Sequence, residues 1–384
     1  MSEWKKTYLR DLIVIKNGKD HKKQKNGQYP VYGSGGIMRY ADSYLYDQES
    51  VLLPRKGTLN NIQFVTEPFW TVDTCYYTVV NRDKVLPYFL YCCLCKMDIQ
   101  SLNTGSAVPS MTFEKYYSIE VPIPPLSTQH RIASILSRYD SLIENYQKQI
   151  KLLEEAAQRL YKEWFVDLHF PGHENTKIVD GVPEGWEKKS VDSIYNIKYG
   201  KNLSTKLITE TGFYPVYGAN GVIGYYDKAN CNEQVVLITS RGNGSGDVLM
   251  TYHKDAFITN NSFIVTPSEG FEYCKLPFTF QFLKMANFRA VRTGAAQPQL
   301  TNQSIHTVDV ILPNKNLIEK FCSATIGMND TIIKYREQIR LLTEARDRLL
   351  PKLMSGELTL EARAEKEDLL ATPCKRGWEE DEAK

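Results

Sequence analysis

The chain has 384 residues, a formal net charge of +2 and a hydrophobic fraction of 42%. Its length allows two ordinary domains, and its apolar content is typical of a folded core, so global disorder is excluded. The nearly neutral charge also excludes a uniformly basic, histone-like protein, although local basic patches such as His21–Lys25 remain compatible with nucleic-acid binding.

No segment of the sequence predicts export or membrane insertion. The first residues, MSEWKKTYLRD, lack an apolar signal core, and no apolar run reaches the roughly 18 residues that a membrane span needs. Eight cysteines in a chain of this length are then expected to be reduced thiols. We therefore expect a cytoplasmic protein without a membrane anchor.

In chain order, the first distinctive segment is YPVYGSGGI, which begins at Tyr29, and a close copy, YPVYGANGV, begins at Tyr214. Further matches occur in the same order in both halves: Trp4 and Trp186, Gly18-Lys19 and Gly200-Lys201, VLLPRKG ending at Gly57 and VLITSRG ending at Gly242, Leu86-Pro87 and Leu276-Pro277, and TGSAVP from Thr104 and TGAAQP from Thr293. A period of about 190 residues is too long for a solenoid, so each repeat is predicted to be a domain with an appendage.

Each half begins with a predicted mixed α/β domain, at 1–125 and 167–312. Short β-branched and aromatic runs bounded by Gly, Asn and Asp predict strands at QESVLLP and CYYTVV in the first half, and at EQVVLIT and SFIVTP in the second. Apolar segments near Pro87–Met97 and Pro277–Met285 predict one helix in each domain.

Each domain is followed by a predicted long helix, at 126–166 and 313–355, and a partly ordered tail is expected at 356–384. Apolar residues recur there at alternating steps of four and three, which is the heptad pattern of a coiled-coil seam. With about 38 residues each, the helices would span on the order of 55 Å. The predicted seam residues are Ile132, Leu136, Tyr139, Ile143, Tyr146, Ile150, Leu153 and Leu160 on the first helix, and Phe321, Met328, Ile332, Tyr335, Ile339, Leu342 and Leu349 on the second.

The two helices have the same length and phase, so we expect them to pack against each other as an antiparallel pair. Only Thr325 and Arg346 interrupt the second seam. A pseudo-two-fold axis through such a pair would place the two domains at its opposite ends. The predicted fold class is therefore α+β, with two similar mixed α/β domains joined by two long antiparallel coiled-coil helices.

Some patterns resemble catalytic sites, but each lacks a required partner. The loop at Arg241–Asp247, RGNGSGD, contains GxGxG, yet the strand-like segment VLMTY follows where a nucleotide-binding loop would open a helix. An adenine methyltransferase would need an Asn/Asp-Pro-Pro-aromatic motif, and the one Pro-Pro pair of this chain is followed by Leu126. We therefore predict no catalytic residue.

The candidate metal ligands also do not form a complete site. Cys92, Cys93 and Cys95 lack the second ligand pair of a zinc site, and the matching positions of the second repeat hold apolar residues, so these cysteines are expected to fill the core. His169 and His173 flank a Pro-Gly pair, which prevents one helix from directing both at a metal. No metal site is predicted.

Two similar domains held at a fixed separation suit a long partner such as double-stranded DNA, contacted at two places. The Gly-Lys pairs and the turns RKG and SRGN combine positive charge with backbone that can approach phosphates closely, and Arg, Asn and Gln can contact base edges. The residues predicted to contact DNA are Lys16, Lys19, Lys22, Lys23, Tyr32, Ser34, Arg39, Arg55, Lys56, Thr58, Asn60, Thr104 and Ser106 in the first half, and Lys198, Lys201, Tyr217, Asn220, Arg241, Asn243, Ser245, Thr293, Gln297 and Gln299 in the second.

For each of these residues, a role in a turn or on an ordinary surface stays open. The recurrence of YPVYG favours a structural role for this segment, with glycines that permit a tight turn and tyrosines that pack on a sheet. The residues that follow it differ, SGGIMRYAD in one copy and NGVIGYYDK in the other. This pattern is expected if the scaffold is shared and the binding surface is not.

From about Trp4 to Leu358, the chain resembles the specificity subunit of type I restriction–modification systems. The resemblance rests on YPVYGSGG and YPVYGANG, on TGSAVPSM and TGAAQPQL, and on IPPLSTQHRIASIL leading into the first heptad helix. The segments RLYKEWFVDLHFPGHE and RLLPKLMSGEL after the helices also match this family.

The resemblance implies a non-catalytic subunit with two target-recognition domains, each of which binds one half of an asymmetric, bipartite DNA target. The two conserved helices act as spacers that set the gap between the halves. Two methylation subunits are expected to dock on the outer faces of Leu126–Trp164 and Asn314–Leu353, and two restriction subunits complete the complex. No cofactor is expected in this chain, because S-adenosylmethionine and ATP with Mg belong to the partner subunits.

Two other functions stay open from the residues alone. The first is a stand-alone DNA-modifying enzyme with a divergent active site, and the second is a coiled-coil scaffold with no role in nucleic-acid binding. Methylation of DNA by the isolated chain, or an absence of DNA binding, would distinguish them.

Overall fold

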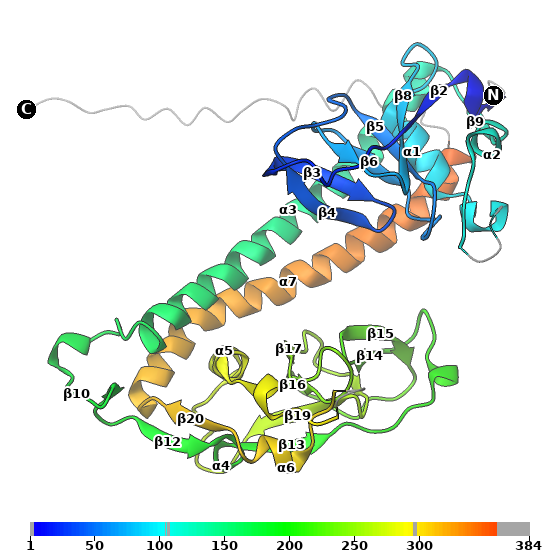
Figure 1. Cartoon of the computed structure of the whole chain (residues 1–384). Coiled ribbons are helices and arrows are strands. Elements are labelled where there is room, and N and C mark those ends of the chain that lie inside the picture. Colours follow the sequence, from blue (N-terminus) through cyan, green and yellow to red (C-terminus); the bar gives the residue numbers. More distant parts are fainter. Residues whose placement is uncertain (1–3, 104, 106–107, 295–297, 359–384) are drawn as a thin grey trace, which may run out of the picture. The chain divides into compact units, whose positions relative to one another are not determined.

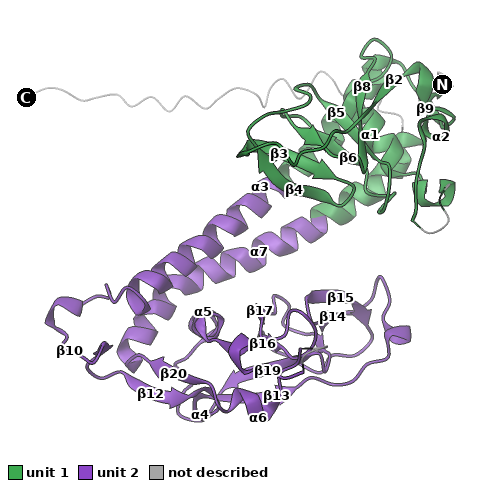
Figure 2. Cartoon of the chain, viewed as in Figure 1, with its two compact units in different colours: residues 1–142, 342–384 green, residues 143–341 purple. Residues whose placement is uncertain are grey.

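The computed structural model describes residues 4–103, 105, 108–294 and 298–358 (Figure 1). The chain divides into two compact units, which are coloured in Figure 2: unit 1 comprises residues 1–142 and 342–384, and unit 2 comprises residues 143–341. Each unit contains one domain and a part of both long helices, α3 (Leu126–Phe165) and α7 (Lys315–Met354).

Unit 1 contains a small mixed α/β domain built on two sheets. Its elements are β1 (Lys5–Tyr8), η1 (Leu9–Asp11), β2 (Ile13–Asn17), β3 (Asn26–Gly33), β4 (Gly36–Ala41), β5 (Ser50–Pro54), β6 (Gln63–Val65), β7 (Trp70–Thr71), β8 (Cys75–Val80), α1 (Pro87–Cys95), η2 (Ile99–Leu102), α2 (Phe113–Tyr117) and β9 (Glu120–Ile123). One sheet has the antiparallel order β2-β8-β5-β6, and the other has the order β4-β3-β7 with β3 and β7 parallel. Strand β1 pairs with β9 directly before α3.

Unit 2 repeats the sheets of unit 1 and adds η3, the β10–β11 hairpin and η4. Its elements are η3 (His173–Asn175), β10 (Ile178–Val179), β11 (Val182–Pro183), β12 (Glu187–Ser190), α4 (Val191–Ile194), β13 (Tyr195–Tyr199), η4 (Thr205–Leu207), β14 (Tyr214–Gly218), β15 (Gly221–Tyr226), β16 (Val236–Thr239), β17 (Val248–Met250), β18 (Phe257–Ile258), β19 (Ser262–Pro267), α5 (Leu276–Met285), η5 (Phe288–Val291), α6 (Asn302–Ile305) and β20 (Asp309–Leu312). The sheet orders β13-β19-β16-β17 and β15-β14-β18 are those of unit 1, and β12 pairs with β20. The predicted internal repeat and mixed α/β class are confirmed.

The cores of both domains include residues of the long helices. In unit 1, strand β5, SVLLP, is buried along its whole length, and its cluster of apolar residues extends to Ile132 and Leu136 of α3 and Leu353 of α7. In unit 2, the corresponding cluster joins residues of β16, β19 and α5 to Tyr161 of α3 and Phe321 of α7. Because burial of apolar area is the main favourable contribution to folding, the helices stabilise both domains.

Residues of α3 and α7 contact each other in antiparallel order. In unit 2, the ring of Tyr146 stacks on Tyr335 with centroids 4.8 Å apart, and further along α3 the ring of Tyr161 meets Phe321 at 5.7 Å. Each of the predicted seam residues is buried or half-buried. At one interruption of the seam, the hydroxyl of Thr325 donates a hydrogen bond to the carbonyl oxygen of Phe321 at 2.8 Å, which satisfies it inside the helix pair.

The cysteine prediction needs one correction. Cys92 and Cys93 are buried in the core of unit 1, but Cys95, the last residue of α1, is exposed. Among the described residues, no group of three or more His, Cys, Asp and Glu side chains could hold a metal ion. No helix in the described part of the chain is long and apolar enough to cross a membrane. Residues 359–384 of the predicted tail lie outside the described ranges.

We predict that Phe321→Ala destabilises unit 2, because Phe321 is fully buried against aromatic residues of α3 and α5. Removal of a buried phenyl ring should cost about 3–5 kcal/mol of unfolding free energy, measured by urea denaturation with circular dichroism. The control is Leu152→Ala on α3, since Leu152 is 63% exposed and its truncation should change stability by less than about 0.5 kcal/mol. Equal effects of both substitutions would contradict the packing described here.

Candidate nucleic-acid interface

Three connections of unit 1 converge at one end of its sheets. The side-chain amide of Asn61 donates a hydrogen bond to the carbonyl oxygen of Ser34 at 2.7 Å, which joins the β5–β6 connection to the β3–β4 turn. The backbone N–H of Gly57 donates to the carbonyl oxygen of Pro109 at 2.9 Å, and that of Met111 donates to Arg55 at 2.9 Å. We call residues 33–36, 55–61 and 108–111 the loop face of unit 1.

Unit 2 builds an equivalent surface with the same kinds of contact. The hydroxyl of Thr239 donates to the carbonyl oxygen of Ala219 in the β14–β15 turn at 2.7 Å. The backbone N–H of Gly242 donates to Pro298 at 2.9 Å, and that of Leu300 donates to the carbonyl oxygen of Ser240 at 2.7 Å. Residues 218–221, 240–247 and 298–300 form the loop face of unit 2.

Glycines at matching positions allow these loops to form. Gly57 and Gly242 have φ values of +90° and +85°, a region that side chains with a Cβ rarely adopt. A Cβ on Gly18 would lie 2.0 Å from the carbonyl oxygen of Val72, and one on Gly200 would lie 2.3 Å from that of Thr259. The glycine of each Gly-Lys pair therefore has a packing role.

The loop faces bring together part of the predicted DNA-binding set. Unit 1 groups Ser34, Arg55, Lys56, Thr58 and Asn60 on its loop face. Unit 2 groups Asn220, Arg241, Asn243 and Gln299 on its loop face. Thr293 lies beside them, because it forms a β-bridge with Gln299. These residues are exposed except for Ser34 and Arg55, which are half-buried.

The remaining basic residues of the predicted set lie outside the loop faces as defined by these contacts. They are the exposed Lys16, Lys19, Lys22, Lys23, Lys198 and Lys201, and the half-buried Arg39. The guanidinium of Arg39 donates hydrogen bonds to the carbonyl oxygen of Gln24 at 3.0 Å and to the side chain of Asn26 at 2.9 Å. Arg39 therefore holds the segment between β2 and β3 in place.

Two predicted DNA contacts are corrected by the structure, because direct contact requires an exposed side chain. Tyr217 is 3% exposed, and its hydroxyl lies 2.9 Å from Nδ1 of His253 and accepts the backbone N–H of Tyr252 at 3.1 Å. Ser245 is fully buried and donates to the carbonyl oxygen of Ser240 at 3.3 Å. Both hydroxyls support the fold of unit 2 and are left out of the interface.

The equivalent tyrosine of unit 1, Tyr32, is half-buried, and its ring packs edge-on against Phe69. Burial raises the pKa of Tyr32 to about 12, so its phenol stays neutral and can donate a hydrogen bond. Thr104, Ser106 and Gln297 of the predicted set lie outside the described residues.

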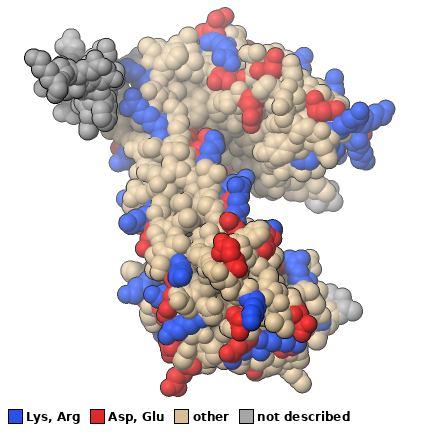
Figure 3. Space-filling view, turned by 90° about the vertical axis from the view of Figure 1, so that its left-hand side faces the viewer, with Lys and Arg blue, Asp and Glu red and all other residues tan. Residues whose placement is uncertain are grey.

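The charges of the loop faces favour an anionic partner. The unit 1 loop face contains Arg55 and Lys56 and no acidic residue. In unit 2, the one carboxylate of the loop face, Asp247, forms an ion pair with Arg289, so the charge of Arg241 is not opposed by a free acid on this surface. Elsewhere, basic and acidic side chains are interspersed, as the face drawn in Figure 3 shows. Local charge on the loops, rather than the net charge of the chain, can therefore attract phosphates.

A groove of about 950 Å³ in unit 2 borders its loop face at Asn220. It lies between the domain and the helix pair, and its lining carries both charges: the basic Lys151, Lys284, Arg336 and Arg340, and the acidic Glu154, Glu155 and Glu337. Arg336 pairs with Glu154, and Arg340 pairs with Glu337. The sequence prediction named none of these basic residues, because it considered the connections between strands. The match of Lys151 in one helix to Arg340 in the other could have indicated this basic position.

We predict that Gly18→Ala destabilises unit 1 by about 3 kcal/mol, because the added Cβ overlaps the backbone of Val72. Gly35→Ala is the control, since nothing lies within 4 Å of the Cβ that it would add. Its unfolding free energy should change by less than about 0.5 kcal/mol. Thermal and urea unfolding of both variants would test the difference, and a stable Gly18→Ala protein would contradict the packing role of this glycine.

Comparisons with known proteins all point to one family. A family model described as the type I restriction modification DNA specificity domain matches residues 1–155 and 183–336. The chain is 26% identical over 349 residues to the MjaIX type I restriction enzyme specificity subunit of Methanocaldococcus jannaschii, covering 83% of this chain and 79% of that protein. It is 22% identical over 374 residues to the HindI specificity subunit of Haemophilus influenzae, covering 72% and 79%.

A solved structure supports the same fold. The crystal structure of a type I restriction–modification system S subunit from M. genitalium aligns with a TM-score of 0.60 at 20% sequence identity, covering 91% of this chain and 96% of that one. At this identity the match shows a shared fold. Because the family model matches most of the chain, once in each half, the chain belongs to the type I restriction–modification DNA specificity family.

Proposed function

We propose that this chain is the DNA sequence-specificity subunit of a type I restriction–modification complex, with target-recognition domains at 1–125 and 167–312. Each domain binds one half of a bipartite target in double-stranded DNA through its loop face. The observation that carries this proposal is the duplicated loop face, in which the same backbone hydrogen bonds, from Gly57 to Pro109 and from Gly242 to Pro298, present different side chains.

The differences between the loop faces favour an asymmetric target. Directly after the shared glycine, unit 1 has Thr58 where unit 2 has Asn243. In the hairpin turn, Gly35 of unit 1 corresponds to Asn220 of unit 2. Asn can make two hydrogen bonds to adenine, whereas Thr makes a single bond or a methyl contact, and Gly offers only its backbone. Two faces with different hydrogen-bonding groups select different bases.

The long helices, predicted at 126–166 and 313–355 and found as α3 and α7, act as spacers and as a docking surface. Two methylation subunits dock on the outer faces of Leu126–Trp164 and Asn314–Leu353, and two restriction subunits join the complex. A docked subunit would cover the exposed apolar residues of these helices. They are Leu142 and Leu152 on α3, and Ile326 and Leu341 on α7.

In this proposal the chain itself is not catalytic and acts in the cytoplasm. The methylation subunits bind S-adenosylmethionine, and the restriction subunits bind ATP with Mg. Purified chain that methylates DNA without any partner would instead establish a stand-alone enzyme. A reconstituted complex that binds no DNA would favour a scaffold.

We predict that Lys56→Ala and Arg241→Ala each weaken DNA binding by the complex reconstituted with its methylation subunit. Each exposed cation on a loop face should neutralise one phosphate, so each substitution should reduce the slope of log affinity against log salt by about 1. Gel-shift titrations over a salt series measure this slope.

The control for these substitutions is Lys6→Ala, because Lys6 is exposed on β1 and outside the loop face. It should leave the salt dependence unchanged. If all three substitutions changed the slope equally, the loop faces would not be the DNA-binding surfaces.

A further prediction concerns the spacer. Deletion of one heptad from each helix, residues 143–149 and 338–344, shortens the pair by about 10 Å. Since B-DNA rises about 3.4 Å per base pair, the preferred gap between half-sites should change by about three base pairs while the half-sites keep their bases. Methylation mapping in a host with the matching methylation subunit gives both quantities, and altered half-site bases would contradict the division of roles.

A further inference from the structure

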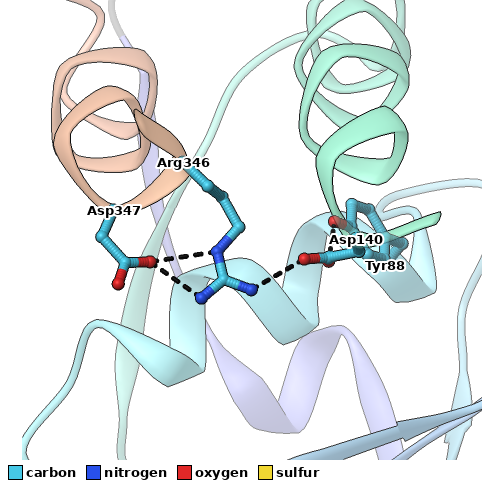
Figure 4. A network of polar contacts seen from close by, with 4 residues as sticks. All are labelled: Tyr88, Asp140, Arg346 and Asp347. Carbon is cyan, nitrogen blue, oxygen red and sulfur yellow. Dashed lines mark hydrogen bonds and ion pairs between the residues drawn. The ribbon is translucent and has the colours of Figure 1, made fainter. Parts of the chain in front are cut away.

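In unit 1, four side chains from α1, α3 and α7 form one polar network (Figure 4). Tyr88 of α1 donates a hydrogen bond from its hydroxyl to the carboxylate of Asp140 on α3. The guanidinium of Arg346 on α7 donates to the other carboxylate oxygen of Asp140 at 2.8 Å, and Asp347 holds the guanidinium from its far side at 2.9 Å. We call Tyr88, Asp140 and Arg346 clamp 1.

Unit 2 contains a network of the same composition. The hydroxyl of Tyr252, which follows β17, donates to Oε1 of Glu154 on α3 at 3.3 Å. Arg336 of α7 donates to the same oxygen at 3.0 Å, and its guanidinium lies 3.7 Å from the centre of the Tyr252 ring. We call Tyr252, Glu154 and Arg336 clamp 2. Each clamp combines a tyrosine from the domain, a carboxylate from α3 and an arginine from α7.

The internal repeat does not account for this similarity. The positions of the second repeat that match clamp 1 hold Phe278, Asn329 and Ala157, which cannot form a tyrosine–carboxylate–arginine network. Clamp 2 instead uses a tyrosine from a different part of the domain. The same three types of side chain therefore meet in both units at positions that the repeat does not relate. This indicates that both units need a polar contact between the domain, α3 and α7.

The clamps supply directional contacts, which apolar packing lacks. The apolar clusters that join each domain to the helices are non-directional, and a heptad seam re-creates its contacts after a shift of one heptad, about 10 Å. A charge-assisted hydrogen bond is lost when its groups move by much less than one helical turn, about 5.4 Å. Asp140 and Arg346 have side chains that are 32% and 31% exposed, so water only partly screens their pairing.

Residues of the clamps lie where three elements meet. In each unit, the carboxylate accepts hydrogen bonds from the domain and from α7 together, so it ties the domain to both helices. Burial also raises the pKa of Tyr88, which keeps its hydroxyl protonated as a donor. A domain that tilted on the helices would break the bond from its tyrosine.

From this geometry we infer that the two clamps fix the orientation of each recognition domain on the helix pair, and so restrict the spacer lengths that the subunit accepts. The inference rests on the proposed function. In this role the clamp side chains are positioning residues: they determine how accurately the two loop faces match half-sites at a given separation.

The test compares a Tyr88→Phe, Tyr252→Phe double variant with the wild type. Phe keeps both rings and removes only the hydroxyls. Each protein is reconstituted with its methylation subunit and titrated with DNA in which the spacer differs from the preferred length by one or two base pairs. Because the double variant loses two hydrogen bonds of about 1 kcal/mol each, the preference for the correct spacer should fall by up to about 30-fold.

The matched control is Tyr146→Phe, since Tyr146 lies in the helix pair, where its ring stacks on Tyr335, and belongs to neither clamp. It should keep the spacer preference of the wild type. An unchanged preference in the folded double variant overturns the inference. A wild-type complex that binds no DNA at any spacer length overturns the proposed function and, with it, the inference.

A second variant separates positioning from stability. Tyr88→Phe, Asp140→Leu and Arg346→Leu together replace the polar groups of clamp 1 by apolar residues and leave no hydroxyl without its acceptor, a change that often preserves or raises stability. We expect an unfolding temperature at least equal to that of the wild type, together with a reduced spacer preference. If the spacer preference stays at the wild-type value in this stable variant, clamp 1 has no positioning role.

Discussion

The packing of each domain core onto the helix pair is the interaction on which the rest of the structure depends. Ile132 and Leu136 complete the core of unit 1, and Tyr161 and Phe321 complete that of unit 2. Neither domain completes its main apolar cluster without the helices, because residues of α3 and α7 belong to both of these clusters. The helices are therefore part of each domain's core as well as a connection between domains, and each loop face is held by the same packing.

Polar contacts add direction to this packing. Backbone hydrogen bonds from Gly57 and Gly242 hold the loops, and the clamps join the domains to both helices. Each of these contacts is worth about 1 kcal/mol or somewhat more, far less than the apolar clusters contribute. Their importance lies in geometry, since a hydrogen bond restricts angle and distance where an apolar contact tolerates sliding. Apolar packing thus supplies most of the stability, and the polar contacts restrict the orientation of the packed elements.

Much of this organisation could be predicted from the sequence, because it recurs or is periodic. The repeat, the strands such as β5 and the long helices all have such patterns. The recurrence of YPVYG predicts that its tyrosines pack on a sheet, and Tyr217 does so; its choice as a DNA contact was wrong, because β14 is buried from Pro215 to Gly218. The clamps could not be predicted from the sequence, because Asp140 and Arg346 are 206 residues apart and no periodic pattern relates them. Arg346 was visible only as an interruption of the seam.

The two loop faces show how one backbone arrangement can present different side chains. The shared glycines cannot vary freely, because the φ of +90° at Gly57 is strained for any other residue. The next residue has no such restriction, and it is Thr58 in one unit and Asn243 in the other. If this position contacts DNA as we propose, substitutions there would change the hydrogen-bonding groups offered to a base without moving the backbone. Because the clamps and the domain cores lie outside these loops, the proposed base contacts and the proposed spacing between half-sites would change independently.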